Sequence, residues 1–424
     1  MKNSKRKVVQ CCISGMILVI MACQPKTKDE NQQKHVMENQ EPTTTTYEND
    51  VAFMSKHIKI IELTNDENSS SIALSPALQG RVMTSTAGNT GSSYGWINRN
   101  LFESGETSPH FNAYGGEERF WLGPEGGQYS IFFKNGEKFT LNNWFTPKLI
   151  DLEHYKAERK SDQEVVFTKK ASLTNYSGFT FDLEIERSVK ILSNTEIMGH
   201  LGLSSIHGVQ TVGYTTTNLL TNTGDVPWSK ENGLLSIWLL GMFAPSQTTA
   251  VMIPYLTDAE GGSGKVVNIY ESFGQIPDSR LIVTQNMIYF RADGQYRSKI
   301  GLLPSRAKDV LGAYDAKNGV LTIVKYNKPN GITDYVNSTW EIQEEPYGGD
   351  MVNSYNDGSP EPGAKPLGPF YELETSSPAL ALDVGESGKH VQTTCHFEGN
   401  KATLEEIALK VFGVSLEGIA QAFK

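Results

Sequence analysis

Most of this chain consists of short apolar or alternating runs separated by clusters of Gly, Asn, Asp and Pro. The clearest run is Phe179–Glu186, in which apolar and polar residues alternate. In an extended strand, such alternation sends one set of side chains to a buried face and the other set to water. Strands do not alternate with long helical stretches, and this disfavours a parallel α/β sheet. The sequence therefore predicts a mainly β fold, a large antiparallel sandwich with short helices.

The expected strands share this patterning and these bounding residues. They are Ser71–Leu74, Arg81–Thr84, Tyr129–Phe133, Val165–Leu173, Phe179–Leu192, Gly208–Asn218, Leu234–Met242, Thr249–Tyr255, Leu281–Phe290, Gly319–Tyr326 and Thr339–Gln343. A short helix is expected before them, at Val51–Leu63.

The end of the chain has helical periodicity instead. Thr403–Glu406 has the form of a capping box, and apolar residues from Leu404 to Phe412 fall on one helical face. A second short turn begins at Ser415. We expect a C-terminal helical segment, 400–424, docked on the β body, with a partner-binding face as the alternative.

The first residues predict secretion and lipid attachment. Positive residues between Lys2 and Lys7 precede the apolar run Ile13–Ala22 and then Cys23, the pattern of a lipoprotein signal with its lipobox. We expect a signal peptide at 1–22 and acylation of Cys23. The chain would then be anchored to the lipid bilayer of the cell envelope, at the outer membrane, facing the periplasm or the cell surface. Because the apolar run is short for a bilayer span, an uncleaved membrane helix is the weaker alternative.

Residues 23–50 are polar and rich in Gln, Glu, Lys and Thr, which predicts a flexible stalk. Lys28-Asp29-Glu30 in this stalk resembles the acidic surface-export signals of some Bacteroidetes lipoproteins, and ordinary solvated charges explain it equally well. Residues 51–399 are expected to form one β domain.

Composition excludes several classes of function. The formal net charge of −10 argues against nucleic acid as a partner, because binding to phosphates needs clustered Lys and Arg. Cys11 and Cys12 lie in the expected signal and Cys23 is the lipid site, so Cys395 alone remains and no disulfide forms within the body. No Walker loop, HExxH or paired CxxC motif is present. Neither a metal nor a cofactor is predicted.

Two segments carry more polar and aromatic residues than a scaffold needs. In Ser108–Glu125, His110 and Arg119 offer donors and Trp121 a flat apolar surface, the combination that a sugar ring requires. A glycine-rich hairpin with a core tryptophan is the alternative. In Gly348–Gly358, which contains Asn353 and Asp357, a turn is the first interpretation, and a sugar or calcium ligand set the second.

A third segment, Gly368–Pro378, contains two carboxylates. On a strand, Glu372 and Glu374 lie on the same face. Such a pair can supply a general base and a partner for hydroxyl groups, while a solvated acidic face is the alternative. His390 and His396 follow later in the chain.

Three motifs resemble those of a known superfamily. Leu74–Val82 contains a Gly-Arg step like that of its early strand pair, and Gly115–Glu125 is similar to its segment of paired glycines and a tryptophan. Leu373-Glu374-Thr375, followed by Pro378, resembles the Leu-Glu-Thr stretch in which mutarotases place their catalytic base. Together, over roughly 63–399, they resemble the galactose mutarotase-like superfamily of aldose 1-epimerases and accessory domains of polysaccharide-active enzymes.

This resemblance implies a β supersandwich with Glu374 as the base. Residues 218–225 and 236–243 look closest to an uncharacterised Bacteroidetes lipoprotein family of the same fold. Mutarotases pair the base with histidines in Asn-x-x-His contexts, and this sequence has none; His110, His207 and His396 are candidates without matching surroundings.

These expectations describe an envelope lipoprotein that binds a mono- or oligosaccharide. If it is an enzyme, epimerase-like or polysaccharide-active, Glu374 is the base, Glu372 or His396 the acid or orienting partner, and Arg119 binds hydroxyl or carboxylate oxygens. The other expected ligand-binding side chains are His110, Trp121, Asn353 and Asp357. The alternatives are a non-catalytic glycan-binding lipoprotein of a polysaccharide-utilisation system, and a polysaccharide lyase or hydrolase.

Overall fold

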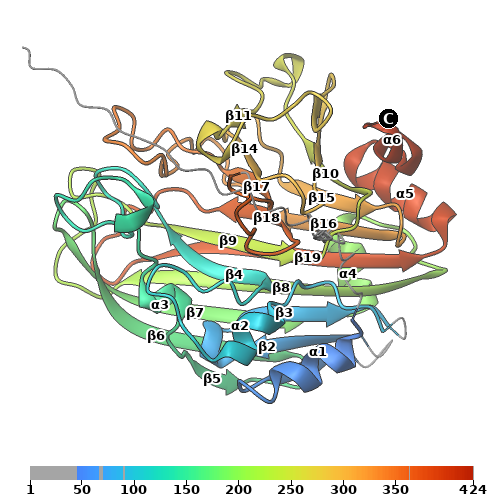
Figure 1. Cartoon of the computed structure of the whole chain (residues 1–424), viewed down its shortest axis with the longest axis horizontal. Coiled ribbons are helices and arrows are strands. Elements are labelled where there is room, and N and C mark those ends of the chain that lie inside the picture. Colours follow the sequence, from blue (N-terminus) through green and yellow to red (C-terminus); the bar gives the residue numbers. More distant parts are fainter. Residues whose placement is uncertain (1–44, 66–69, 89–90, 362, 424) are drawn as a thin grey trace, which may run out of the picture. The chain divides into compact units, whose positions relative to one another are not determined.

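The computed structural model describes residues 45–65, 70–88, 91–361 and 363–423 (Figure 1). The expected signal peptide, the expected lipid site Cys23 and most of the expected stalk, including Lys28-Asp29-Glu30, lie outside these residues. Within the described ranges, no helix has the length and apolarity that crossing a bilayer requires.

The strands form two antiparallel sheets, and the first, sheet I, has nine strands. Its order is β1 (Ile61–Thr64), β2 (Ser71–Ser75), β3 (Arg81–Thr86), β4 (Gly116–Gly123), β9 (Ser236–Phe243), β18 (Tyr371–Ser376), β17 (Val352–Asn356), β14 (Ser298–Leu302) and β11 (Asn268–Ile269). Strands far apart in the sequence, such as β4, β9 and β18, therefore lie side by side (Figure 1).

Sheet II has ten strands. Its order is β12 (Leu281–Val283), β13 (Met287–Arg291), β10 (Thr249–Pro254), β15 (Val310–Asp315), β16 (Val320–Tyr326), β19 (Ser387–Gly399), β8 (Val209–Asn222), β7 (Thr180–Ile191), β6 (Glu164–Thr174) and β5 (Lys156–Arg159). The predicted mainly β, antiparallel class is confirmed.

The helices are short by comparison. They are α1 (Tyr47–Met54), α2 (Arg99–Ser104), α3 (Lys148–Asp151), α4 (Asn194–Leu201), α5 (Lys401–Phe412) and α6 (Leu416–Gln421), with 3-10 turns η1 (Pro76–Leu78), η2 (Leu141–Asn143), η3 (Asp258–Glu260) and η4 (Glu271–Phe273). Helix α1 lies earlier than the expected helix Val51–Leu63, because Ile61–Thr64 pairs with β2 as a strand.

Some strand predictions are wrong. Tyr129–Phe133 forms turns and bends, because its buried side chains pack into the core while its backbone does not join a sheet. Thr339–Gln343 is also a loop, in which the Gln343 side-chain amide donates to the carbonyl of Thr339 at 2.7 Å. Leu281–Phe290 splits into β12 and the start of β13.

The C-terminal helix α5 begins at Lys401, and its N-cap, Asn400, lies three residues before the predicted N-cap Thr403. The side chain of Asn400 accepts from the backbone of Ala402 and Thr403, while the Thr403 hydroxyl donates to the carbonyl of His207 at 2.8 Å. The predicted apolar stripe is buried, and residues such as Leu404 and Phe412 join one core cluster with residues of sheet II. Helices α5 and α6 thus pack against their own β body.

The main core lies between the sheets and shows the predicted alternation. Along β7, Phe181, Leu183 and Ile185 are fully buried, whereas the residues between them are exposed or half-buried. They share a hydrophobic cluster with Phe120 and Leu239 of sheet I. Cys395 is also buried, on β19, and burial raises the pKa of its thiol to about 12.

Strand β4 contains a bulge that turns two consecutive glutamates toward the space between the sheets. The four residues from Gly116 to Arg119 of β4 face the three residues from Met242 to Leu240 of β9, so one extra residue is inserted. The backbone of Trp96 lies close against Gly115, because any other residue would place its Cβ 1.9 Å from the carbonyl oxygen of Trp96. The φ of Gly115, 92°, also lies in the region that favours glycine. Beyond the bulge, alternation directs Arg119 and Trp121 to the opposite face.

Both glutamates bind side chains of sheet II. Glu117 Oε2 lies 3.1 Å from His396 Nε2 and accepts from the Tyr214 hydroxyl at 3.3 Å. Glu118 pairs with Arg187 at 2.8 Å and accepts from Gln392 at 2.7 Å. Because the side chains of Glu118 and Arg187 are 0% exposed, each charge depends on the other for compensation.

We expect Arg187→Met to lower the free energy of unfolding by about 3–5 kcal/mol, because Glu118 would then be buried without its countercharge. Urea denaturation followed by tryptophan fluorescence measures this loss. Lys160→Met is the control, since it removes an ion pair with Glu158 that is exposed to solvent. Equal urea midpoints for the two variants would contradict the assigned role of the buried pair.

Candidate functional site

A cluster of charged and aromatic side chains lies on the face of sheet I that is turned away from sheet II. On β18, the Thr375 hydroxyl contacts His390 and Gln392 of β19, so Thr375 faces sheet II. Its neighbours Glu372 and Glu374 therefore face outward. We call the outward group the charged cluster; it comprises Arg119, Glu125, Trp238, Lys299, Glu372 and Glu374.

The sheet register explains why these side chains meet. Glu372 of β18 is paired with Tyr355 of β17, and Tyr355 with Lys299 of β14. Directly paired residues lie on the same face of a sheet, so all three share the outer face. Arg119 and Trp238 reach the same face from β4 and β9. Four strands, β4, β9, β18 and β14, thus supply the strand residues of the charged cluster, and β17 lies between β18 and β14.

Each carboxylate of β18 has its own cation. Arg119 Nη2 donates to Glu372 Oε1 in a buried ion pair. Lys299 Nζ lies 3.0 Å from Glu374 Oε2, and the Trp238 indole donates to the same oxygen at 3.0 Å. The other oxygen of Glu374, Oε1, has no hydrogen-bond partner within the described residues. One face of this carboxylate is therefore available to accept a proton or a hydrogen bond.

The two ion pairs are nearly enclosed. The side chains of Glu374 and Glu372 are 0% and 7% exposed, and those of Arg119 and Lys299 are 2% and 9% exposed. Solvent thus reaches Glu372 and Lys299 slightly, while Glu374 is shielded. In such surroundings an electrostatic interaction is stronger than it is in water.

The pKa values of Glu372 and Lys299 are both raised, but for different reasons. Burial raises the pKa of Glu372 to about 7, although Arg119 opposes the shift, and the nearby Glu374 adds to it. Burial alone would lower the pKa of Lys299, but the neighbouring carboxylates, Glu374 foremost, outweigh burial and raise it. Lys299 is therefore a permanent cation near neutral pH, whereas Glu372 can hold or release a proton.

Glu125 adds a third carboxyl group to the charged cluster. Burial raises its pKa, while Lys299 opposes the shift and Glu374 reinforces it. Part of its surface remains open to solvent. It follows the last residues of β4, so the strand that positions Arg119 also brings Glu125 to the charged cluster.

Aromatic rings surround the cations. Lys299 Nζ lies 4.9 Å from the ring centre of Trp238 and 5.8 Å from that of Phe273. Arg119 Cζ lies 5.0 Å from the ring centre of Trp121, which is 4% exposed. These contacts stabilise the cations and cover much of the two indole faces.

Asn353 and Asp357 occupy the margin of the charged cluster. Asn353, next to Glu374 in the register, donates to the Tyr270 hydroxyl at 3.2 Å. Asp357 is 1% exposed and accepts from the Tyr355 hydroxyl at 2.7 Å, and burial raises its pKa to about 6. The segment from 356 to 358 is not the tight turn expected from the sequence, because Asn356 ends β17 and Asp357 is fixed inside.

The candidate histidines His396 and His110 do not join the carboxylates. His396 lies on β19 of sheet II, between the sheets, 3.1 Å from Glu117. His110 precedes β4; its Nδ1 lies 2.6 Å from the carbonyl oxygen of Trp144, and its ring stacks on Phe145 at 4.4 Å. Of the expected catalytic and binding residues, the fold therefore brings together Arg119, Glu372 and Glu374, with Trp121 against Arg119 and Asn353 beside Glu374.

Sequence reasoning missed Lys299, Trp238 and Glu125. Lys299 stands in a short strand of small and apolar residues that no motif marks. Trp238 and Glu125 lie in segments that the resemblance covers, but no role was assigned to them. Only the order of the strands in sheet I reveals that the three are neighbours of Glu374.

A family model described as "Family of unknown function (DUF6786)" matches residues 45–423. A search of curated protein sequences finds no match.

Several solved structures resemble this chain. A galactose mutarotase-like protein from Lactobacillus casei ATCC 334 is 13% identical, with a TM-score of 0.46 over 80% of this chain and 100% of that one. A galactose mutarotase related enzyme from Lactobacillus acidophilus is 8% identical, with a TM-score of 0.41 over 80% and 98%. The Slr1438 protein from Synechocystis sp. PCC 6803 is 14% identical, with a TM-score of 0.44 over 81% and 96%.

The first two descriptions name the superfamily that the sequence resemblance predicted. The further likeness to an uncharacterised Bacteroidetes lipoprotein family stays a prediction. All three TM-scores lie below 0.5, so the function must be argued from this chain's own side chains.

The raised pKa of Glu372 predicts a pH-dependent stability. The folded chain holds this proton up to about pH 7, whereas an ordinary glutamate releases it near 4.5. The contribution of this bound proton to the free energy of unfolding is therefore complete below pH 4.5 and is lost as the pH rises to 7. The free energy of unfolding falls by about 3 kcal/mol at most over this range. Urea unfolding across this window should show the native protein losing more stability than Glu372→Gln. The exposed-site variant Glu186→Gln should follow the native curve, and parallel curves for all three proteins would contradict the shift.

Proposed function

The chain belongs to the DUF6786 family of unknown function, and we propose that it binds a carbohydrate at the charged cluster and interconverts its anomers. One observation carries this proposal. A buried carboxylate with a free oxygen, Glu374, lies two positions from Glu372, a carboxyl with a pKa of about 7, on one strand face. Two positions along a strand span about 7 Å, a distance that one sugar ring can bridge.

Glu374 is the general base in this proposal. Lys299 and Trp238 hold one of its oxygens, while Oε1 has no hydrogen-bond partner in the described part of the chain and is the atom that accepts the proton. The proton it removes is that of the anomeric hydroxyl. Lys299 is a positioning residue, because it acts on the sugar through Glu374.

Glu372 is the general acid. As Glu374 takes the proton from the anomeric hydroxyl, Glu372 delivers its own proton to the ring oxygen and the bond between C1 and the ring oxygen breaks. A carbonyl forms at C1 of the open-chain sugar. Rotation about the C1–C2 bond and the reverse transfers close the ring with the opposite configuration at C1. Electrons and protons balance without a further reactant, and each carboxyl regains its starting state.

The surrounding groups orient the sugar. Arg119 Nε is buried and has no hydrogen-bond partner among the residues that the structure describes, so it can donate to a hydroxyl or carboxylate oxygen. Glu125, partly open and near Lys299, can accept from a second hydroxyl. Partially exposed and unpaired polar atoms around buried charges are typical of a small-molecule site.

A non-catalytic glycan receptor is the second candidate. The observation that favours it is the separation of the histidines from the carboxylates: in the described part of the chain, no histidine contacts Glu372 or Glu374. A polysaccharide lyase or hydrolase is the third, and release of products from uronic-acid polymers would reveal it.

We further propose that the protein is an envelope lipoprotein held in the outer membrane through Cys23. The support is the order of positive residues, apolar run and cysteine in the first 23 residues. Several acyl chains on Cys23 would give a stable attachment where one chain would not.

Exchange between the anomers of free sugars tests the enzyme proposal directly. NMR magnetisation transfer on a panel of hexoses and uronic acids should show exchange faster than in buffer. Glu374→Gln should lower the enzymatic rate by about 10²–10⁴-fold, because the base is lost. The native rate should fall as the pH rises above about 7, where Glu372 loses its proton.

Glu186→Gln, at an exposed position of β7, is the matched control and should keep the native rate. Exchange at the buffer rate for every sugar of the panel would exclude the epimerase. Calorimetric binding of the same sugars, equal for the native protein and Glu374→Gln, would then support the receptor.

Lipid attachment is tested by expressing the full chain with a radiolabelled or clickable fatty acid. The native protein should carry the label and fractionate with membranes, and Cys23→Ser should lose both. Cys12→Ser, within the expected signal, should keep the label. Membrane fractionation of Cys23→Ser at the native level would exclude this anchor.

A further inference from the structure

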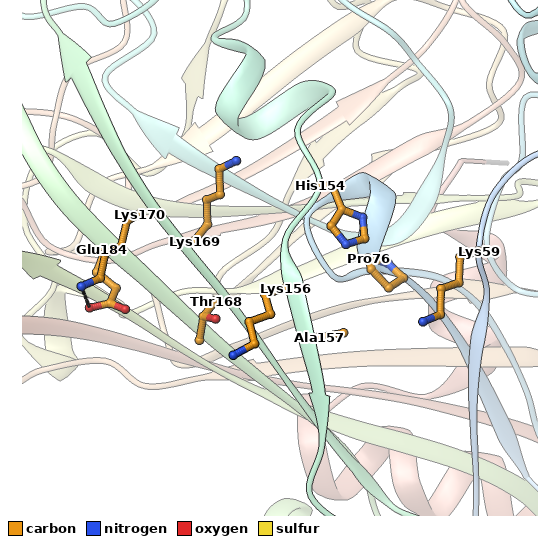
Figure 2. A pocket seen from close by; sticks show the side chains of 9 residues that line it. All are labelled: Lys59, Pro76, His154, Lys156, Ala157, Thr168, Lys169, Lys170 and Glu184. Atoms are coloured by element: carbon orange, nitrogen blue, oxygen red, sulfur yellow. Dashed lines mark ion pairs between the residues drawn. The ribbon is translucent and has the colours of Figure 1, made fainter.

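A basic groove lies apart from the charged cluster. Its volume is about 640 Å³, within the range of ligand sites, and it is formed by β5, β6, β7 and the segments that precede β1 and β5 and follow β2 (Figure 2). Its charged lining consists of Lys59, His154, Lys156, Lys169, Lys170 and Glu184. None of these residues belongs to the charged cluster.

The groove is positive in a protein whose net charge is −10. Lys169 pairs with Glu153 at 2.6 Å and Lys170 lies 3.7 Å from Glu184, so these two charges are partly compensated. Lys59 and Lys156 form no ion pair or hydrogen bond in the described part of the chain, and both are exposed. A local excess of positive charge on an acidic protein attracts anionic ligands while the rest of the surface repels them.

The cations are arranged along the groove instead of around one point. Lys156 faces Thr168 across the β5–β6 pair, and Lys170 lies two positions further along β6 on the same face. Figure 2 shows Lys59 near one end, Lys156 in the middle and Lys170 near the other end, with the side chains pointing in different directions. A single small anion would contact only part of this set, whereas a chain with repeated anionic groups could contact all three.

The uncharged lining indicates what kind of chain fits. Pro76 and Ala157 offer small apolar surfaces, and Thr168 offers a hydroxyl. The groove lacks the large apolar anchors by which peptides bind, and it has no Phe, Tyr or Trp on which nucleic-acid bases stack. Because it is concave and carries no protruding apolar side chain, it also does not suit the plane of a bilayer.

We propose that this groove is a second carbohydrate site, which binds an anionic oligosaccharide with a carboxylate on successive sugar rings. The lysines contact the carboxylates, and Pro76, Ala157 and Thr168 contact the rings. Such binding needs no chemistry at the charged cluster. The groove would hold an acidic glycan chain to the protein surface by charge, with affinity that falls as the salt concentration rises.

Calorimetric titration with tetragalacturonate at low salt tests this proposal, with the neutral maltotetraose and a tetraglutamate peptide as comparison ligands. The native protein should bind tetragalacturonate more tightly than either. The double variant Lys156→Glu/Lys170→Glu should bind it at least about tenfold more weakly, because two attractive charges become repulsive. Anomer exchange should be unchanged in this variant. Binding therefore tests the proposal for the groove, and anomer exchange independently tests the proposal for the charged cluster.

The matched control is Lys265→Glu/Lys389→Glu, which changes the net charge equally at two exposed positions outside the groove. It should bind tetragalacturonate within about twofold of the native protein, since neither position lines the groove and the Coulomb energy falls with distance. The proposal is overturned if both double variants lose affinity equally, or if maltotetraose binds as tightly as tetragalacturonate. It is also overturned if tetraglutamate binds more tightly, which would favour an acidic peptide.

Discussion

The bulge in β4 is the constraint on which the rest of the structure depends. One extra residue between Gly116 and Arg119 turns both Glu117 and Glu118 toward sheet II. There Glu118 meets Arg187 at 2.8 Å and Glu117 meets His396 at 3.1 Å, so the two sheets are joined by charge as well as by apolar packing. The same insertion sets the phase of the rest of β4. Without it, Arg119 would point into the core and Glu372 would lose its cation.

The charged cluster follows from this phase. Burying a carboxylate is unfavourable unless its charge is compensated. Arg119 forms an ion pair with Glu372, and Lys299 forms one with Glu374. The compensation is unequal, because Lys299 and Trp238 converge on one oxygen of Glu374 while burial raises the pKa of Glu372 to about 7. A carboxylate whose Oε1 has no partner among the described residues, beside a carboxyl group that keeps its proton up to about pH 7, suits a base and an acid. A merely structural pair would not need the free oxygen of Glu374.

The sequence predicted the fold class well but assigned some individual strands wrongly. Alternation identified long strands such as β7 because period two is a local property of the chain. It failed at Tyr129–Phe133, where apolar side chains are buried from a loop, since burial alone does not require a paired backbone. It also failed at Thr339–Gln343, a loop in which the side chain of Ile342 is exposed. The shared face of Glu372 and Glu374 was predictable from their spacing. Their partners were not, because Lys299 comes from β14, far away in the sequence.

By itself, the sequence determined the β class, the helical end of the chain and the pairing of two glutamates on one strand face, because each depends on residues a few positions apart. It also carries the signal pattern around Cys23, which lies outside the described residues. The tertiary structure decided that His396 lies between the sheets, that Arg119 and Lys299 compensate the carboxylates, and that a basic groove forms beside β5. These depend on strand order and on one bulge, and contacts between distant segments leave no periodic trace in the chain that makes them.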